Sequence, residues 1–280
     1  QLPESIKHEY TLAKKHSFSP TSIERYATCP YMYYISNVLG ISSDFDNVDS
    51  DKTEHILKGN LSHRYLELFI NDYLAGKLTE GNLQNRFNDF YVPEAEKVIP
   101  DFLHNVGRFA DMMTVTKDAI FDVINEMHKN LLSETSIFKP YKCEASLKDD
   151  PDFNIHSLTV GEDENGENVI SILGRIDRID VSKKTYSGNN YYAIYDYKTS
   201  NSNRFATNLD PEKILKDGTK IQLPFYMLAL ENKNFKVGEI AYINVKNDFR
   251  TSADSAMEIS RIRMDDFYKD TTGNNDEDAK

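Results

Sequence analysis

Apolar and polar positions follow two different periods along this chain of 280 residues. In the first half, apolar residues recur at threes and fours, which is the period of a helix with one buried face. The clearest example runs from about Val106 to Phe138. A second begins after Gly59 and includes Leu61 and Tyr65. The first half is therefore predicted to be mainly helical.

Two short helices are predicted nearer the start of the chain. Thr21 and Glu24 have the spacing of a capping box, so the first of these helices is expected to begin at Thr21. Pro30 breaks that run and opens a second helix, which we expect to end at Gly40. The stretch Asp44–Lys52 is polar and acidic, and is predicted to be a loop.

Beyond Lys139–Pro140 the period shortens to two, which is typical of strands. Strands are predicted at Tyr141–Leu147, Phe153–Val160, Val169–Val181, Tyr191–Lys198, Ile240–Val245 and Met257–Ile262, with a loop at Gly161–Glu167 and a helix at about Pro211–Leu230. A helical half that leads into a sheet interrupted by one helix indicates an α/β or α+β fold. We expect one domain over residues 1–264, helical at about 17–139 and sheet-containing at about 140–264, followed by a polar, disordered tail at 265–280.

The composition narrows the functional class. The 33 Lys and Arg residues stand against 45 Asp and Glu residues, for a net charge of -12, which argues against a protein that coats nucleic acid non-specifically. The sequence contains no apolar run of roughly 18 residues, so no membrane span is expected. Cys29 and Cys143 lie far apart and match no zinc or redox spacing, which favours a reducing, cytoplasmic setting.

The main candidate for chemistry is a pair of neighbouring strands. If they form a hairpin that turns at Ser187–Gly188, Asp177 lies across from Lys198 and diagonal to Asp196, whereas Asp180 points to the other face. A hard divalent cation such as Mg²⁺ would compensate two converging carboxylates. Lys198 would then orient or deprotonate a metal-bound water and stabilise charge that develops on phosphorus.

Two further motifs accompany the hairpin. Gln222 and Tyr226 are four residues apart and share a helix face, and His63 and Glu67 have the same spacing. Each motif alone also has a purely structural interpretation, such as opposed charges on a strand, polar residues at a helix boundary or a satisfied histidine. Asp-x-Lys alone is expected by chance about twice in a chain of this composition.

Together the motifs resemble the RecB-like branch of the PD-(D/E)xK nuclease superfamily, the AddB/RecB type. The matching segments are Ser19–Tyr26 with Cys29, Pro30 and Tyr33, Gly59–Glu67, Gly174–Asp180, Asp196–Thr199 and Gln222–Tyr226. They occur in the family's order from about residue 17 to 230. The resemblance implies an α/β fold with a restriction-endonuclease-like core, in which a mixed central sheet is flanked by helices and preceded by a helical N-terminal region.

The resemblance also implies roles for individual residues. The expected metal ligands are His63, Asp177, Asp196 and the main-chain carbonyl of Tyr197, with Glu67 as a candidate ligand of a second metal. The expected catalytic residues are Lys198, Asp177 and Asp196. Gln222, Tyr226, Arg175 and Arg178 are expected to bind the substrate. The implied cofactor is Mg²⁺ or Mn²⁺.

Some relatives, including AddB-type helicase-nuclease subunits, hold an iron-sulfur cluster with one cysteine near the first helices and three near the C-terminus. Cys29 occupies the first of these places, but no cysteine follows Tyr226. Four thiolates cannot come from two cysteines, so no cluster is expected in this chain.

The implied function is a metal-dependent deoxyribonuclease, an exonuclease of DNA recombination or repair. The chain has no phosphate-binding loop of the ATPase type, so a helicase partner would lie outside it. The alternative is a non-catalytic DNA-binding or scaffold module, and a hydrolase of other phosphoesters is more remote. The segment Ile172–Tyr226 has a net charge of +3 within the chain total of -12, so DNA binding is expected at one cleft with acidic surroundings.

Overall fold

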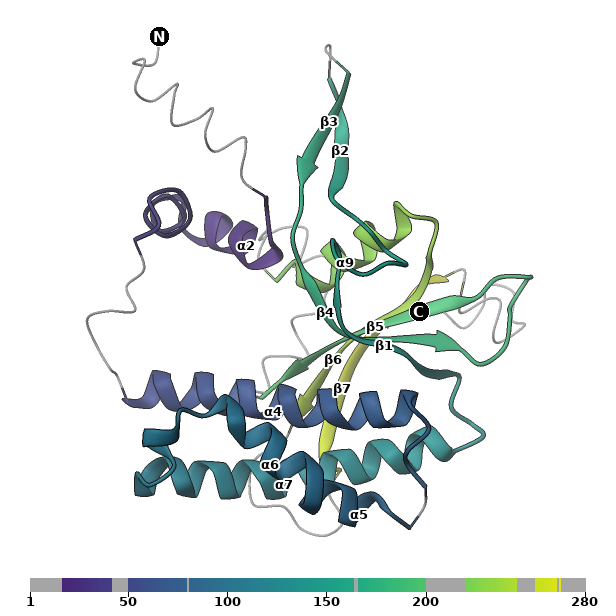
Figure 1. Cartoon of the computed structure of the whole chain (residues 1–280). Helices are drawn as coiled ribbons and strands as arrows, with labels where there is room; N and C mark the ends of the chain where they lie inside the picture. Colours follow the sequence, from purple (N-terminus) through teal and green to yellow (C-terminus); the bar gives the residue numbers. More distant parts are fainter. Residues whose placement is uncertain are drawn as a thin grey trace. The chain divides into compact units, whose positions relative to one another are not determined.

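A computed structural model describes residues 17–41, 50–79, 81–163, 166–199, 220–245, 255–265 and 267. The chain forms two compact units, each assembled from segments far apart in the sequence (Figure 1). The first unit comprises Gln1–Asp46, Ser146–Arg175 and Asp210–Phe235, and the second comprises Asn47–Ala145, Ile176–Leu209 and Lys236–Lys280.

The second unit is built on a five-stranded mixed sheet with the strand order β1-β4-β5-β6-β7. The strands are β1 (Phe138–Ser146), β4 (Arg175–Ser182), β5 (Tyr191–Lys198), β6 (Lys236–Val245) and β7 (Met257–Arg263). β5 and β6 run parallel, whereas β4 with β5 and β6 with β7 are antiparallel. β6 is buried along nearly its whole length, as expected of an interior strand that is covered on both faces.

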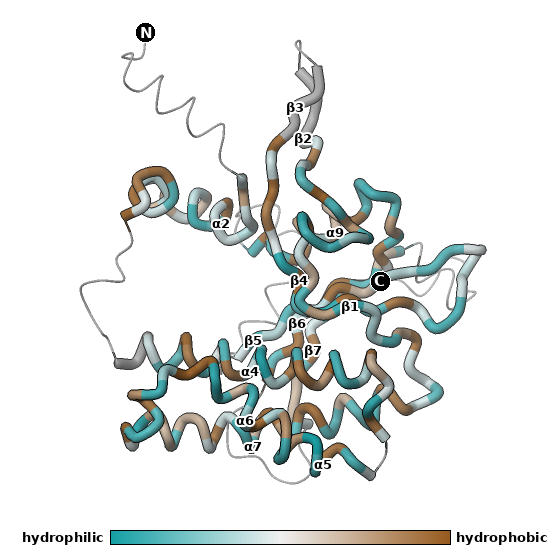
Figure 2. Tube along the Cα trace, viewed as in Figure 1, coloured by the Kyte–Doolittle hydropathy of each residue, from teal (hydrophilic) through white to brown (hydrophobic). Residues whose placement is uncertain are grey.

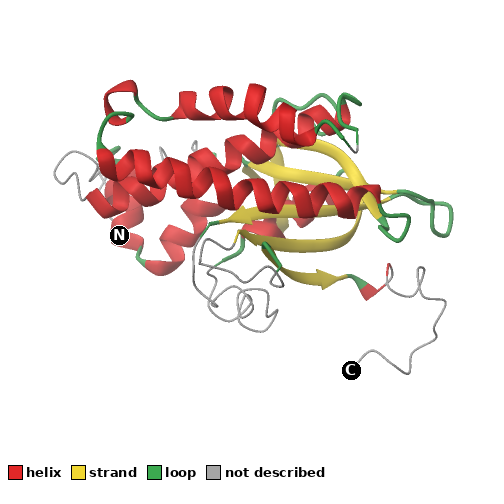
Figure 3. Ribbon diagram, turned by 90° about the horizontal axis from the view of Figure 1, so that it is seen from below, coloured by secondary structure: helices red, strands yellow, loops and turns green. Residues whose placement is uncertain are grey.

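Two long helices, α4 (Ser50–Leu74) and α7 (Gly107–Leu132), lie side by side and pack against this sheet (Figures 1 and 3). Hydrophobic residues recur along both helices, visible as repeated brown segments in Figure 2. Leu61 and Phe69 of α4 and Ile124 of α7 are completely buried. Burial of a side chain of this size contributes about 1.5–3 kcal/mol. The mixed sheet with flanking helices confirms the predicted fold.

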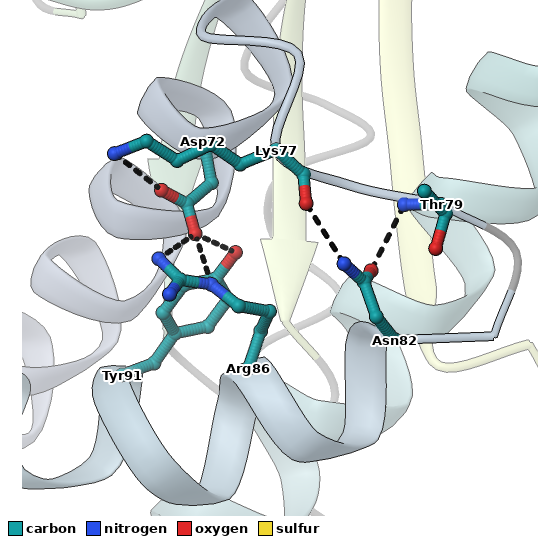
Figure 4. Close-up of polar contacts among 6 residues, drawn as sticks. All are labelled: Asp72, Lys77, Thr79, Asn82, Arg86 and Tyr91. Atoms are coloured by element: carbon teal, nitrogen blue, oxygen red, sulfur yellow. Dashed lines mark hydrogen bonds and ion pairs between the residues drawn. The ribbon is translucent and has the colours of Figure 1, made fainter.

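Short helical segments connect α4 to α7, and a buried polar cluster fixes the first of them. They are α5 (Leu83–Arg86), η3 (Phe87–Tyr91), α6 (Val92–Ala95), η4 (Glu96–Val98) and η5 (Asp101–Leu103). Asp72 of α4 is almost fully buried and accepts hydrogen bonds from Arg86 and from the hydroxyl of Tyr91 (Figure 4). Asn82 donates to the carbonyl of Lys77 in the intervening turn. The cluster supplies the hydrogen bonds that a buried carboxylate requires.

The first unit contains the N-terminal helices, a β-hairpin and a later helix. Its elements are α2 (Pro20–Thr28), α3 (Pro30–Tyr33), the π-helix η1 (Tyr34–Val38), β2 (Ser157–Asp163), β3 (Gly166–Ser171) and α9 (Gln222–Glu231). β2 and β3 pair antiparallel. Phe18 bridges Ile172 just beyond the hairpin, and the carboxylate of Glu24 accepts the backbone N–H of Gln222, joining α2 to α9.

The first helix begins earlier than the sequence predicts. The cap is Ser19, whose hydroxyl accepts the N–H of Ser22, while the Ser22 hydroxyl lies 2.9 Å from the N–H of Ser19. Pro20 occupies the first turn, where its missing N–H costs nothing. The expected capping box of Thr21 and Glu24 is therefore wrong by two residues.

Other predicted boundaries also change. α4 continues through Gly59 and begins at Ser50, so residues 50–52 belong to a helix rather than to the acidic loop. α7 ends at Leu132 instead of Phe138, because Ser133 adopts an extended conformation. The expected helix at residues 211–230 is described only from residue 220 onward, and α9 begins at Gln222.

The segment expected as one strand at Val169–Val181 is two. The backbone of Ile172 and Leu173 leaves β3 to bond His156 and Phe18, and Gly174 then accepts the N–H of Leu147. The hairpin of β2 and β3 occupies most of the loop expected at residues 161–167. Phe267, expected in the polar tail, is fully buried against Phe138 and Tyr191. None of the described helices combines the length and apolar character needed to cross a membrane.

Candidate active site

The pairing of β4 with β5 places two acidic residues on one face of the sheet. Arg178 pairs with Tyr195, so the next position in the antiparallel register sets Asp177 against Asp196. Asp177 also accepts the backbone N–H of Tyr197, with an N···O distance of 2.8 Å. The predicted pairing of Asp177 with Lys198 is wrong by two residues, but a shift of two leaves every side chain on the same face.

The register shifts between the turn and the strands. The turn lies where the sequence places it, since Tyr186 bridges Asn189 around Ser187 and Gly188, which both have positive φ angles. The next described pair is Val181 with Tyr192. Five residue steps on the β4 side therefore match three on the β5 side, and the two extra residues account for the altered pairing.

His63 reaches the two strands from α4. Its Nε2 lies 3.2 Å from the carbonyl oxygen of Tyr197, and its Nδ1 lies 3.5 Å from a carboxylate oxygen of Asp177. His63 remains partly exposed, whereas Asp177 is 9% exposed. The structure thus brings together three of the four groups that the sequence proposes as metal ligands.

Asp196, the fourth proposed ligand, forms an ion pair with Lys198. Asp196 is only 3% exposed. Burial raises its pKa to about 7, the charge of Asp177 adds to this increase, and Lys198 opposes it. The Lys198 ammonium also lies 5.1 Å from the centre of the Tyr242 ring. Lys198 is therefore held beside the carboxylates, with its side chain 29% exposed.

Glu144 of β1 is a site residue that the sequence did not reveal. Among the described residues, one ligand atom each of His63, Glu144 and Asp177 lies within 4.8 Å of the others. Glu144 sits in a segment correctly predicted as a strand, but only the adjacency of β1 to β4 brings it to Asp177. No local pattern in the sequence specifies that strand order.

The donor set suits a hard divalent cation. It consists of carboxylate oxygens, a main-chain carbonyl oxygen and an imidazole nitrogen. Neighbouring ligands of an octahedral ion with bonds of roughly 2.0–2.1 Å are about 3 Å apart, close to the 3.2 Å between His63 Nε2 and the Tyr197 carbonyl. A cation here would also offset the repulsion between buried carboxylates.

Glu67 lies outside this cluster. Its carboxylate accepts a hydrogen bond from Arg64 on the same helix, with an N···O distance of 2.7 Å. Both residues border an open groove of about 510 Å³, which is further lined by His55, Gly59, Asn60, His63 and Glu144. A role for Glu67 with a second metal stays a prediction.

The four expected substrate-binding residues occupy different settings. Arg178 is buried on the opposite face from Asp177 and donates two hydrogen bonds to Asp180, a placement that argues against contact with DNA. Arg175 is exposed at the start of β4. Gln222 and Tyr226 lie on α9 of the first unit, and their contact with DNA stays a prediction.

Within the first unit, the ring of Tyr226 packs closely against Gly174. A Cβ atom at Gly174 would lie 2.7 Å from Cε1 of Tyr226 and 3.2 Å from a methyl carbon of Leu147. Glycine at this position therefore lets the Tyr226 ring lie against the chain just before β4.

Comparisons with known proteins agree with this geometry. The PD-(D/E)XK nuclease superfamily matches residues 17–277. The chain is 24% identical over 248 residues to an ATP-dependent helicase/deoxyribonuclease subunit of Clostridioides difficile (strain 630), a match that covers 85% of this chain and 20% of that protein. The corresponding subunit of Clostridium perfringens (strain SM101 / Type A) is 29% identical over 235 residues, covering 80% of this chain and 18% of that protein. The chain thus spans about a fifth of the length of these curated relatives, and it belongs to the PD-(D/E)XK nuclease superfamily.

Proposed function

We propose that this chain is a divalent-metal-dependent DNA nuclease that hydrolyses phosphodiester bonds in DNA recombination or repair. The observation that carries the proposal is the convergence of His63, Asp177 and the Tyr197 carbonyl beside the Asp196–Lys198 pair. Membership of a nuclease superfamily supports the reaction class. The relatives named as helicase/deoxyribonuclease subunits support DNA as the substrate and a helicase as a partner outside this chain.

In this proposal His63, Asp177, Asp196 and the Tyr197 carbonyl hold Mg²⁺ or Mn²⁺. The bound ion would polarise the scissile phosphate and lower the pKa of an attacking water. Lys198 lies beside these ligands, and its ammonium is suited to orient that water or to stabilise negative charge on the phosphoryl oxygens. The buried carboxylate of Asp196 holds the Lys198 ammonium in one position. The protein therefore orients this catalytic group before the substrate binds.

Substrate contacts are proposed for Arg175, Gln222 and Tyr226. Arg175 is an exposed cation on the strand that carries Asp177, and such a side chain suits a phosphate oxygen. We leave Arg178 out of the DNA contact and assign it to the support of β4 through its buried pair with Asp180.

A cleavage assay tests the proposal. Linear duplex, circular duplex and single-stranded DNA are incubated with Mg²⁺, with Mn²⁺ or with EDTA. We expect metal-dependent cleavage that Lys198→Ala and Asp196→Ala reduce by at least about 100-fold. Lys129→Ala is the matched control, since Lys129 is an exposed lysine in the last turn of α7. Faster loss of linear than of circular DNA would support an exonuclease.

The assay also separates the alternative of a non-catalytic DNA-binding module. Such a module would bind DNA but leave all three substrates intact in either metal. If both Lys198→Ala and Asp196→Ala kept the full metal-dependent cleavage, the proposal would also be refuted, because the cleavage would then not depend on these two residues.

A further inference from the structure

A cavity of about 280 Å³ lies within the second unit, on the face of the sheet opposite to Asp177 and Asp196. Arg178 and Tyr195, the direct neighbours of these two residues along β4 and β5, both line the cavity, and successive side chains of a strand point to opposite faces. From these strands the cavity extends to β6, β7 and the C-terminal end of α7. It is therefore separate from the proposed metal site.

The cavity carries more positive than negative charge. Its described lining residues include three arginines and two acidic residues, namely Arg178, Arg261, Arg263, Asp180 and Glu239. Arg178 and Asp180 are buried and pair with each other through two hydrogen bonds. Arg263 donates its Nε–H to Glu239 at 2.8 Å, whereas Arg261 lies 3.8 Å from the same carboxylate oxygen, which is beyond hydrogen-bonding distance. Glu239 thus balances the charge of only one of these two guanidinium groups.

Arg261 and Arg263 are both accessible to a solute. Their side chains are 42% and 37% exposed, whereas that of Glu239 is 2% exposed. The hydroxyl of Tyr195 donates to the second carboxylate oxygen of Glu239 at 3.2 Å, so both oxygens of Glu239 already have partners. A guanidinium presents five N–H donors in a plane and binds carboxylate or phosphate groups through two parallel hydrogen bonds. An oxyanion from solution would therefore complete the pairing of Arg261.

Apolar side chains and hydroxyl groups form the rest of the wall. Leu131 at the end of α7, Ile243 on β6 and Ile259 on β7 are apolar, and Ser133 and Ser136 follow α7 directly. The cavity has the volume of about nine water molecules at roughly 30 Å³ each, so a small inorganic ion would leave most of it to water. Its 280 Å³ is close to the lower end of the range of roughly 300–1,000 Å³ for small-molecule sites.

We propose that this cavity binds a small organic anion, whose carboxylate or phosphate group pairs with Arg261 and Arg263 and whose apolar body contacts Leu131, Ile243 and Ile259. The excess positive charge selects an anion, because a partly desolvated cation is stabilised by an opposite charge. The apolar wall selects a ligand larger than a free ion. The inference stands independently of the proposed nuclease function, since the site lies on the other face of the sheet.

Isothermal titration calorimetry in the presence of EDTA tests the site. Benzoate and thymidine 5′-monophosphate present a carboxylate and a phosphate on an aromatic body, and benzamide and thymidine are their uncharged counterparts. We expect at least one of the two anions to bind with a dissociation constant below about 1 mM, and its uncharged counterpart to bind at least about tenfold more weakly. The anion that binds more tightly identifies the acid group that the site prefers.

Variants of Arg261 locate the bound anion. Arg261→Gln should weaken its binding at least about tenfold, and Arg261→Lys at least about threefold, because lysine keeps the charge but not the planar fork. Arg108→Gln is the matched control and should bind as the wild type does. Arg108 also pairs with a glutamate, Glu54, through a side chain that is 46% exposed, and it lies about 28 Å along α7 from the lining residue Met127.

Thermal melting followed by circular dichroism shows whether each variant is folded, and Arg261→Lys decides the question if Arg261→Gln is not. The inference is overturned if neither anion binds to the wild type, if charged and uncharged compounds bind equally, or if the folded Arg261 variants keep the wild-type affinity. Equal losses for Arg261→Gln and Arg108→Gln would also overturn it, since the effect would then depend on overall charge. Loss of anion binding in Lys198→Ala would place the anion at the metal site and refute the inference as well.

Discussion

The Asp72 cluster allows a quantitative prediction for the variant Arg86→Ala. Asp72 is 3% exposed, and its Oδ2 accepts hydrogen bonds from Arg86 Nε at 2.8 Å, Arg86 Nη2 at 2.5 Å and the Tyr91 hydroxyl at 3.1 Å (Figure 4). The other carboxylate oxygen lies 3.7 Å from the ammonium of Lys77. Arg86→Ala removes the two charged hydrogen bonds and leaves the buried carboxylate with one hydroxyl and a more distant cation.

Loss of one partner from a buried ion pair costs about 3–5 kcal/mol. The lower end applies here, because the Arg86 side chain is 31% exposed and Lys77 can move closer to Asp72. We therefore expect Arg86→Ala to lower the free energy of unfolding by about 3 kcal/mol. Asp72→Asn keeps an acceptor for Tyr91 and lets Arg86 reach water, so we expect a smaller loss of about 2 kcal/mol.

Equilibrium unfolding in urea, followed by circular dichroism, measures these changes. Lys97→Ala is the matched control, since it deletes a cation paired with Glu94 at a side chain that is 66% exposed, and it should cost no more than about 1 kcal/mol. The double variant Asp72→Asn/Arg86→Ala should lose less than the two single variants combined. A loss for Arg86→Ala no larger than that for Lys97→Ala would refute the importance of the buried cluster.

Three further predictions concern glycines and a cysteine. Gly174→Ala should lower the free energy of unfolding by about 1–3 kcal/mol in urea titrations, because its methyl group would overlap Tyr226 and Leu147; a neutral effect would mean that Tyr226 moves aside without cost. Gly59→Ala should instead raise it by up to about 1 kcal/mol, since Gly59 lies inside α4 and a Cβ there meets only Thr199 at 3.8 Å; destabilisation in the same titration would contradict this. Burial raises the pKa of the Cys143 thiol, so iodoacetamide at pH 8 should alkylate Cys143 much more slowly in the native protein than in urea, as measured by mass spectrometry, and equal rates would exclude the burial.

The sequence predicts strands best where residues that favour strands follow a clear turn. β5 is correct at both ends, because Tyr191–Lys198 is rich in tyrosine and follows a turn at Ser187–Gly188. The split of Val169–Val181 into β3 and β4 was not predictable from periodicity, since apolar residues continue through Ile172 and Leu173. What ends β3 is backbone pairing with Phe18 and His156, residues distant enough in the sequence that no local pattern contains them.

The period of two predicts on which face of the sheet a side chain lies, but not which residue of the next strand lies beside it. It separates Asp177 from Asp180 even though the predicted register is shifted, because a shift of two positions preserves the face. The same alternation places Arg178 with Asp180, away from Asp177. Arg178 forms a buried ion pair with Asp180, which argues against the expected contact of Arg178 with DNA.

Glu144 shows a site residue that the pattern of hydrophobic and polar positions cannot identify. Its place beside Asp177 depends on β1 being the neighbour of β4 and on a positive φ angle within β1. Strand order is set by the packing of the whole unit, and the backbone conformation of Glu144 is set by contacts on both sides of it. Neither can therefore be predicted from the alternation of hydrophobic residues. A carboxylate in the middle of a predicted strand therefore becomes a candidate ligand only when the neighbouring strand is known. Assignment of such a site from sequence motifs finds the ligands on the hairpin and overlooks one on the adjacent strand.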